Sequence, residues 1–185
     1  MKSFKSIAMM LCAAVSMNMV IAQEKTVTVG GAPMYPSKNI VENAVNSKDH
    51  TTLVAAVKAA DLVATLQSAG PFTVFAPTNA AFDLLPKGTV ETLLKPENKA
   101  TLAGILTYHV VPGKLGSKEI VALIKAGGGK AELTTVAGGK LVIYMKGKNV
   151  VIKDEKGGEA KVTIKDVNQS NGVIHVTDHI SMPKA

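Results

Sequence analysis

Apolar and polar residues follow two different periods along this chain. From residue 37 to residue 126, apolar side chains recur every three or four positions, as on one face of an amphipathic helix. Ser, Thr, Asp or Pro stands at the start of each stretch, where these residues favour helix initiation. This pattern predicts helices that begin at or near Ser37, Thr51, Asp61, Thr78, Thr89, Pro96 and Ser117. The short apolar run Phe72–Ala76, ended by Pro77, predicts a buried strand.

After Gly129 the apolar residues alternate with polar ones, which is the period of a strand. Turn signals rich in Gly and Asn separate the runs, and the pair Asn171-Gly172 is the strongest of them. The predicted strands cover residues 133–136, 141–145, 150–153, 160–167 and 173–178. Helices followed by a β-meander predict an α+β fold, and the lack of an internal repeat predicts one domain over residues 37–183.

The N-terminal 36 residues precede the predicted domain. Lys2 and Lys5 stand before an apolar run, and the small residue Ala22 closes a cleavage site, so residues 1–22 are predicted to be a signal peptide cut after Ala22. The alternative is a membrane anchor, for which the uninterrupted apolar run is short. Residues 23–36 are expected to be a flexible leader, because Gly and Pro are frequent there. The mature chain is thus expected in the periplasm, at the cell surface or secreted, with no transmembrane segment.

Composition narrows the functional classes. The chain is 46% hydrophobic and 19% charged, which excludes a disordered protein. All 21 basic residues are Lys and none is Arg. Specific readout of nucleic acid relies on the planar guanidinium fork, so we expect no nucleic-acid partner. The single Cys, Cys12, falls within the predicted signal peptide. The mature chain therefore has no thiol for a disulfide, a nucleophile or a thiolate metal site.

The positive charge is concentrated in the strand-rich half. The formal net charge of +7 falls to +5 without residues 1–22, and all of this surplus lies within residues 114–166. Lysines on exposed strands discourage edge-to-edge aggregation, which is one interpretation of them. The other is a surface patch for an anionic polysaccharide, a lipopolysaccharide or a peripheral contact with an anionic membrane. The residues of this predicted patch are Lys140, Lys146, Lys148, Lys153, Lys161 and Lys165.

Three motifs stand in a fixed order along the chain. They cover Phe72–Phe82, Tyr108–Gly113 and Asn171–Asp178, and the last is followed by Met182-Pro183. Together they resemble the fasciclin domain over residues 37–183. The resemblance implies a compact wedge with a β-sandwich-like sheet core and several helices packed against it. It implies adhesion and extracellular binding by secreted or surface-attached proteins, without catalysis.

The resemblance also assigns roles to single residues. Tyr108 and His109 match the family's Tyr-His pair, which is linked with adhesion. If both lie in a strand, they face opposite sides, so one packs inward and the other is free to be exposed. A buried, hydrogen-bonded His109 and a partner contact by the pair are the two interpretations. The motif residues expected to be structural are Phe75, Thr78, Asn79, Phe82, Gly172, His175 and Asp178.

The capping motif and the C-terminal histidines have further interpretations. Thr78 or Asn79 is expected to cap a helix, with an anion site at that helix start as the alternative. His175 and His179, with Asp178, suggest a metal site, but positions four apart on a strand lie about 13 Å apart. We therefore expect no metal and no cofactor.

No catalytic constellation stands out. The serines lie outside a Gly-x-Ser-x-Gly elbow, and the glycine clusters lack the Lys-Ser/Thr of a phosphate loop. The predicted function is binding or adhesion to a protein or polysaccharide surface partner. The alternative is a periplasmic binder or carrier of a small ligand, held in a cleft between helices and sheet. An enzyme is a distant third.

Overall fold

A computed structural model describes residues 25–184, and the predicted signal peptide lies outside the described residues. Within them, helices and strands alternate up to residue 126 and only strands follow, as the sequence pattern predicts. The α-helices are α1 (Ile40–Ala44), α2 (Thr51–Ala59), α3 (Val63–Gln67), α4 (Asn79–Asp83), α5 (Thr89–Leu93), α6 (Lys99–Tyr108) and α7 (Ser117–Ala126), with 3-10 turns η1 (Lys48–His50) and η2 (Pro96–Asn98). The strands are β1 (Val27–Val29), β2 (Ala32–Met34), β3 (Phe72–Pro77), β4 (Val110–Pro112), β5 (Lys130–Thr134), β6 (Lys140–Lys146), β7 (Asn149–Lys153), β8 (Glu159–Gln169) and β9 (Gly172–Thr177).

Seven strands form one mixed sheet in the order β4-β3-β9-β8-β7-β6-β5. Only β3 and β9 are parallel; the other neighbouring pairs are antiparallel. The long strand β8 belongs to both halves of the sheet, and its register against β9 shifts on either side of Ile164. Such bulges bend a strand, so the two halves curl toward a nearly closed, barrel-like wedge. This confirms the expected α+β wedge.

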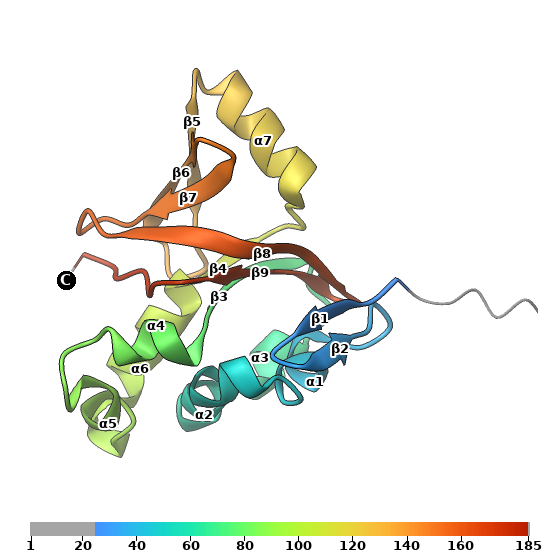
Figure 1. Ribbon diagram of the computed structural model, residues 1–185. Coiled ribbons are helices and arrows are strands. Elements are labelled where there is room, and N and C mark those ends of the chain that lie inside the picture. Colours follow the sequence, from blue (N-terminus) through green and yellow to red (C-terminus); the bar gives the residue numbers. More distant parts are fainter. Residues whose placement is uncertain (1–24, 185) are drawn as a thin grey trace, which may run out of the picture.

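Two hydrophobic cores lie on either side of the band formed by β8 and β9. In Figure 1, helices α1–α6 lie below this band, whereas α7 and strands β5–β7 lie above it. The larger core packs α1, α2, α3 and α6 against β3 and β9. The smaller core packs α7 against β5–β8, around Phe75, Tyr108 and Ile143. Strands β3, β4 and β8 contribute residues to both cores.

The parallel strands β3 and β9 approach each other closely at Gly172. A Cβ atom added there would lie 2.1 Å from the carbonyl oxygen of Phe72, far inside contact distance. Phe72 and Gly172 are also direct partners in the parallel register. A side chain at this glycine of the closing motif would force the two strands apart.

The segment expected to be a flexible leader instead forms a hairpin. Strands β1 and β2 pair antiparallel within residues 27–34, and Val29 and Met34 are each only 3% exposed in the larger core. Gly30 and Gly31 form the turn, with φ angles of 57° and 77°. The prediction was wrong because two glycines between short apolar strands favour a hairpin turn as well as a linker. The folded part thus begins before residue 37.

Two predicted helix caps also differ from the structure. Asn39, and not Ser37, caps α1: its side chain accepts a hydrogen bond from the Glu42 amide, and the Glu42 carboxylate accepts one from the Asn39 amide. Thr78 does occupy the N-cap position of α4, but its side chain makes no capping hydrogen bond. Asn79 reaches the next element instead, accepting from the Thr52 amide at 3.0 Å and donating to the Lys48 carbonyl at 2.8 Å. Asn79 therefore joins α4 to the start of α2.

Candidate functional site

Tyr108 and His109 lie where α6 ends and β4 begins. Tyr108 is the last residue of the helix and His109 is its C-cap, so neither belongs to a strand. Tyr108 is 0% exposed and His109 is 4% exposed. The two residues therefore do not face opposite sides of a strand, which was the condition for one of them to be free for exposure. Helical backbone directs neighbouring side chains about 100° apart, and both directions here lead into packed core. A partner cannot touch either side chain without moving the structure above it.

The Tyr108 hydroxyl connects two turns of the sheet. It donates to the Lys140 carbonyl at 2.7 Å and accepts from the Glu155 amide at 3.2 Å. Its ring lies against Gly139, where an added Cβ would come within 2.6 Å of the ring. Burial raises the pKa of Tyr108 to about 12, and the neighbouring acids Glu155 and Asp154 add to this rise. The hydroxyl therefore stays protonated and keeps its donor at neutral pH.

Acidic side chains beside Tyr108 hold the C-terminal segment in place. Asp154 accepts hydrogen bonds from the amides of Lys156, Gly158 and Met182 at 2.7–3.0 Å. Glu155 accepts from the amides of Lys140 and Lys184, and these bonds lower the pKa of its carboxyl. The sequence motifs did not point to this role, although an Asp at the start of a turn that contains two glycines favours such carboxylate–amide bonds.

His109 fixes the same segment from the other side. Its Nδ1 atom lies 2.8 Å from the Ile105 carbonyl, and its Nε2 atom accepts from the Ser181 amide at 3.0 Å. Because Nε2 accepts a hydrogen bond, it carries no proton, and because Nδ1 faces a carbonyl oxygen, it is the donor. The ring is therefore neutral and protonated on Nδ1. Burial lowers the pKa of His109, and the Ile105 carbonyl and Asp154 oppose this only in part. His109 is thus the buried, hydrogen-bonded histidine of the first interpretation.

His175 plays the corresponding role at the bulge of β8. Its Nε2 atom lies 2.8 Å from the Leu115 carbonyl, its Nδ1 atom accepts from the Asp166 amide at 3.3 Å, and its ring stacks on Phe75. Asp166, in the left-handed region at φ 60°, accepts from the Ser117 amide at 2.6 Å and binds the Ser117 hydroxyl. This chain of contacts fixes the start of α7 relative to the sheet. Burial lowers the pKa of His175.

The other motif residues lie apart from these histidines. Asp178 accepts from the Lys161 amide at 2.8 Å, near the start of β8, and lies 2.8 Å from Nδ1 of the exposed His179. Phe82 is buried in the larger core. His175 and His179 do not converge, and the described residues contain no group of three side chains suited to a metal ion.

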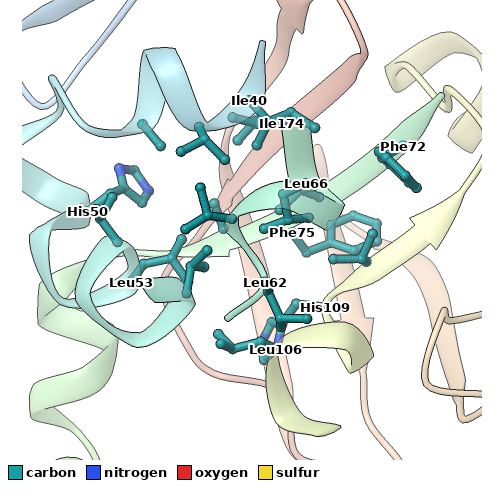
Figure 2. Close-up of a pocket in the computed structure, with 18 of the residues that line it drawn as sticks. Ile40, His50, Leu53, Leu62, Leu66, Phe72, Phe75, Leu106, His109 and Ile174 are labelled. Atoms are coloured by element: carbon teal, nitrogen blue, oxygen red, sulfur yellow. The ribbon is translucent and has the colours of Figure 1, made fainter. Parts of the chain in front are cut away.

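A narrow apolar cavity of about 70 Å³ lies in the larger core. Figure 2 shows Ile40 and Ile174 on one side of it and Leu106 and His109 on the other, with His50 and Phe72 at its two ends. Among the buried side-chain nitrogen and oxygen atoms of the described residues, only Nε2 of His50 lacks a hydrogen bond of normal geometry. Its Nδ1 atom contacts the Ser47 hydroxyl at 2.9 Å. Burial lowers the pKa of His50, and the backbone of Ala76 opposes this.

The six lysines of the predicted patch separate into two groups. Strand register places Lys140, Lys146, Lys153 and Lys161 on the outer face of β6–β8, opposite the buried Leu141 and Ile143. Acids interleave with them there: Lys140 pairs with Glu132 and Lys146 with Glu159, each at 3.0 Å. Lys148 and Lys165 lie elsewhere, because the first is in the β6–β7 turn and the second is in the β8 bulge. The patch is therefore not one surface.

Comparison with known proteins identifies the family to which this chain belongs. A family model of the fasciclin domain matches residues 48–183. Protein sll1483 of a Synechocystis species is 48% identical over 160 residues, which are 86% of this chain and 82% of that protein. Transforming growth factor-beta-induced protein ig-h3 of Sus scrofa is 39% identical over 133 residues, which are 72% of this chain but only 17% of that protein.

The fold comparison agrees with the family match. A fasciclin domain pair from the insect cell adhesion molecule Fasciclin I superposes with a TM-score of 0.71 over 86% of this chain and 58% of that chain, at 16% identity. In the described part of the chain, no helix is long and apolar enough to cross a membrane.

Proposed function

Because the chain belongs to the fasciclin domain family, we propose that it is a secreted or cell-envelope domain that binds extracellular or surface macromolecules in adhesion. Fasciclin domains are non-catalytic adhesion domains, and a solved relative in fold is an insect cell adhesion molecule. The proposal includes no reaction and no cofactor. It takes the partner to be a protein or polysaccharide on a surface, and the chain to be exported by cleavage near Ala22.

The observation that carries the proposal is the way Tyr108 and His109 support exposed segments. Tyr108 binds the backbone of the turns at Lys140 and Glu155, and His109 binds the backbone at Ser181. Neither ring is available to a partner. The adhesive role linked with this pair is therefore indirect: the pair holds together the surface formed by the start of β6, the β7–β8 turn and the C-terminal segment.

Retention on cell envelopes tests the proposal. The purified chain, without residues 1–22, is mixed with envelope fractions of the source cells and sedimented. Saturable retention that unlabelled protein competes away supports adhesion. Retention no greater than that of an unrelated domain of equal charge would contradict it.

The apolar cavity favours a second candidate, a carrier of a small ligand. It is lined by residues of both the helices and the sheet, and Val136, 45% exposed, belongs to its lining. A cavity of about 70 Å³ is roughly half the size of an engineered cavity that binds benzene, so the ligand would be slim and apolar, such as part of an alkyl chain. Mass spectrometry of native protein tests this: a bound small molecule that is released on denaturation supports the carrier, and a bare protein mass contradicts it.

A further inference from the structure

Two predicted patch lysines join two others in a groove that the sequence pattern does not show. Lys148 of the β6–β7 turn and Lys165 of β8 line it together with Lys118 and Lys125 of α7. The groove has a volume of about 550 Å³. No Asp or Glu is among the described residues that line it, and none of the four lysines forms an ion pair with a described residue.

This charge differs from that of the outer face of the sheet. There, Glu132 and Glu159 pair with lysines, and Glu159 also binds the Tyr144 hydroxyl. Two acids, Asp166 and Glu119, stand next to lysines of the groove in the sequence but do not line it. The Asp166 carboxylate accepts hydrogen bonds from the Ser117 amide and hydroxyl, and its charge also acts on Lys165. Within the described residues, the lining of the groove therefore carries four lysines and no carboxylate, so its positive charge is less compensated than that of the outer face.

The fold holds the two walls of the groove in place. The two β8 register shifts, between Val162 and Ile164 and between Ile164 and Val167, break the alternation that would place Lys165 on the same face as Lys161. Asp166, held by His175, fixes the start of α7 opposite this bulge. Lys118 and Lys125 are seven residues apart on α7, so their backbones are about 10 Å apart along one helix face. The positive charges are thus spread along the groove and do not converge on one point.

Between the lysines, the groove is lined by uncharged residues, which suit a ligand with many hydroxyl groups. The Asn149 amide offers donors and an acceptor, whereas the Ser117 and Thr163 hydroxyls, which donate to Asp166 and to the Val176 carbonyl, keep acceptor capacity. Val121 and Val150 offer small apolar surface. No aromatic residue is among the described lining residues, so the groove has no platform for stacked bases. A planar membrane meets a protruding face more readily than charges set on two facing walls. A flexible chain with repeated charges and many hydroxyls fits both the spacing and the lining.

We propose that this lysine groove binds an acidic polysaccharide, carboxylated or sulfated, as a linear segment lying between α7 and the β6–β8 hairpins. The inference rests on the proposed adhesive function and names the chemistry of its partner. Lysine acts here as a point charge and needs no fork geometry. Binding should weaken as ionic strength rises from about 0.02 M to about 0.15 M, because exposed charges are screened.

Two charge-matched variants test the proposal. The groove variant carries Lys→Gln at 118, 125, 148 and 165, and the control variant carries Lys→Gln at 140, 146, 153 and 161. Both lose four charges, and thermal unfolding checks that both fold. The probes are alginate, dextran sulfate, neutral dextran and phosphatidylglycerol vesicles. We expect wild type and control to bind alginate or dextran sulfate and not neutral dextran, and the groove variant to bind roughly tenfold or more weakly.

Several outcomes would overturn the proposal. Equal losses of polymer affinity in both variants would indicate attraction to the overall positive charge and no specific groove. Failure of wild type to bind either acidic polymer would also contradict the proposal. Binding of wild type to vesicles alone would indicate a membrane partner. The same three proteins are then tested for envelope retention. Retention of wild type without polymer binding rejects the groove while leaving adhesion supported, whereas no retention rejects adhesion itself.

Discussion

The Nε2 atom of His109 accepts a hydrogen bond from the Ser181 amide 3.0 Å away, joining the end of α6 to the C-terminal segment. The substitution His109→Ala leaves this buried amide and the Ile105 carbonyl without their partner and opens a void. We expect a loss of about 2–4 kcal/mol in the free energy of unfolding. Urea unfolding measures it, and His179→Ala, which removes an exposed histidine, should cost less than about 0.5 kcal/mol. Equal effects of the two substitutions would show that His109 has no architectural role.

Tyr108→Phe removes one hydroxyl and keeps the packed ring. The Lys140 carbonyl and the Glu155 amide lose their shared partner in a buried setting, which should cost about 1–2 kcal/mol. Tyr144→Phe is the matched control, because its hydroxyl binds Glu159 at the surface. Urea unfolding of both variants gives the comparison. Adhesion lost by Tyr108→Phe while its stability is unchanged would mean that the hydroxyl contacts the partner directly.

Acid should destabilise the fold through its buried histidines. Burial lowers the pKa values of His50, His109 and His175 below 6.5. As the pH falls below 6.5, the unfolded chain therefore binds more protons than the folded chain. The stability contributed by the neutral rings is present above pH 6.5 and is lost as the pH falls toward the folded pKa values. Each histidine adds a slope of at most about 1.4 kcal/mol per pH unit. Urea unfolding between about pH 7.5 and pH 5 measures the slope, and a flat profile would contradict it.

Two glycine substitutions should act in opposite directions. Gly172→Ala places a Cβ 2.1 Å from the Phe72 carbonyl oxygen, so β3 and β9 must separate, and we expect a loss of about 3 kcal/mol or more. Gly104→Ala lies within α6 and meets nothing within 4 Å, so it should stabilise the helix by about 0.5–1 kcal/mol. Thermal unfolding midpoints that shift in the same direction would refute this packing argument.

The N-terminal hairpin should contribute to stability. Met34→Ala removes a side chain that is 3% exposed in the larger core and should cost about 2–5 kcal/mol. Leu84→Ala is the control, because Leu84 is 62% exposed and should change stability by less than about 0.5 kcal/mol. A Met34→Ala variant as stable as wild type would restore the interpretation of residues 23–36 as a leader.

Hydrophobic periodicity predicted most of the helices and strands, but neither where they end nor which residues their terminal side chains contact. The run Tyr108-His109-Val110-Val111 is equally compatible with a helix end and with a strand, and tertiary packing placed the boundary after His109. Asn79 has the right chemistry for a cap, yet its partner is the start of α2, 27 residues earlier. No local pattern contains that information.

The lysines show the same limit for the candidate sites. Lys146 and Lys148 are two residues apart, but one lies on the outer face and the other lines the groove. Lys118 and Lys165 are 47 residues apart, and they share the groove because Asp166 holds the start of α7. Charge clustering was visible in the sequence as an excess over residues 114–166. The division of these lysines between the outer face and the groove depends on the register of β6–β8 and on the bulge in β8, and neither can be read from the sequence.

The place of β9 in the sheet sets the order in which the chain can fold. This strand is the last in the sequence, yet it lies between β3 and β8 in the middle of the sheet and pairs with a strand 100 residues earlier. Without it, β3 and β4 have no connection to the rest of the sheet. Contacts of such long sequence separation form slowly. The larger core, which includes Ile174 and Val176 of β9, therefore cannot be completed until this strand has left the ribosome, whereas no described residue of the smaller core belongs to β9.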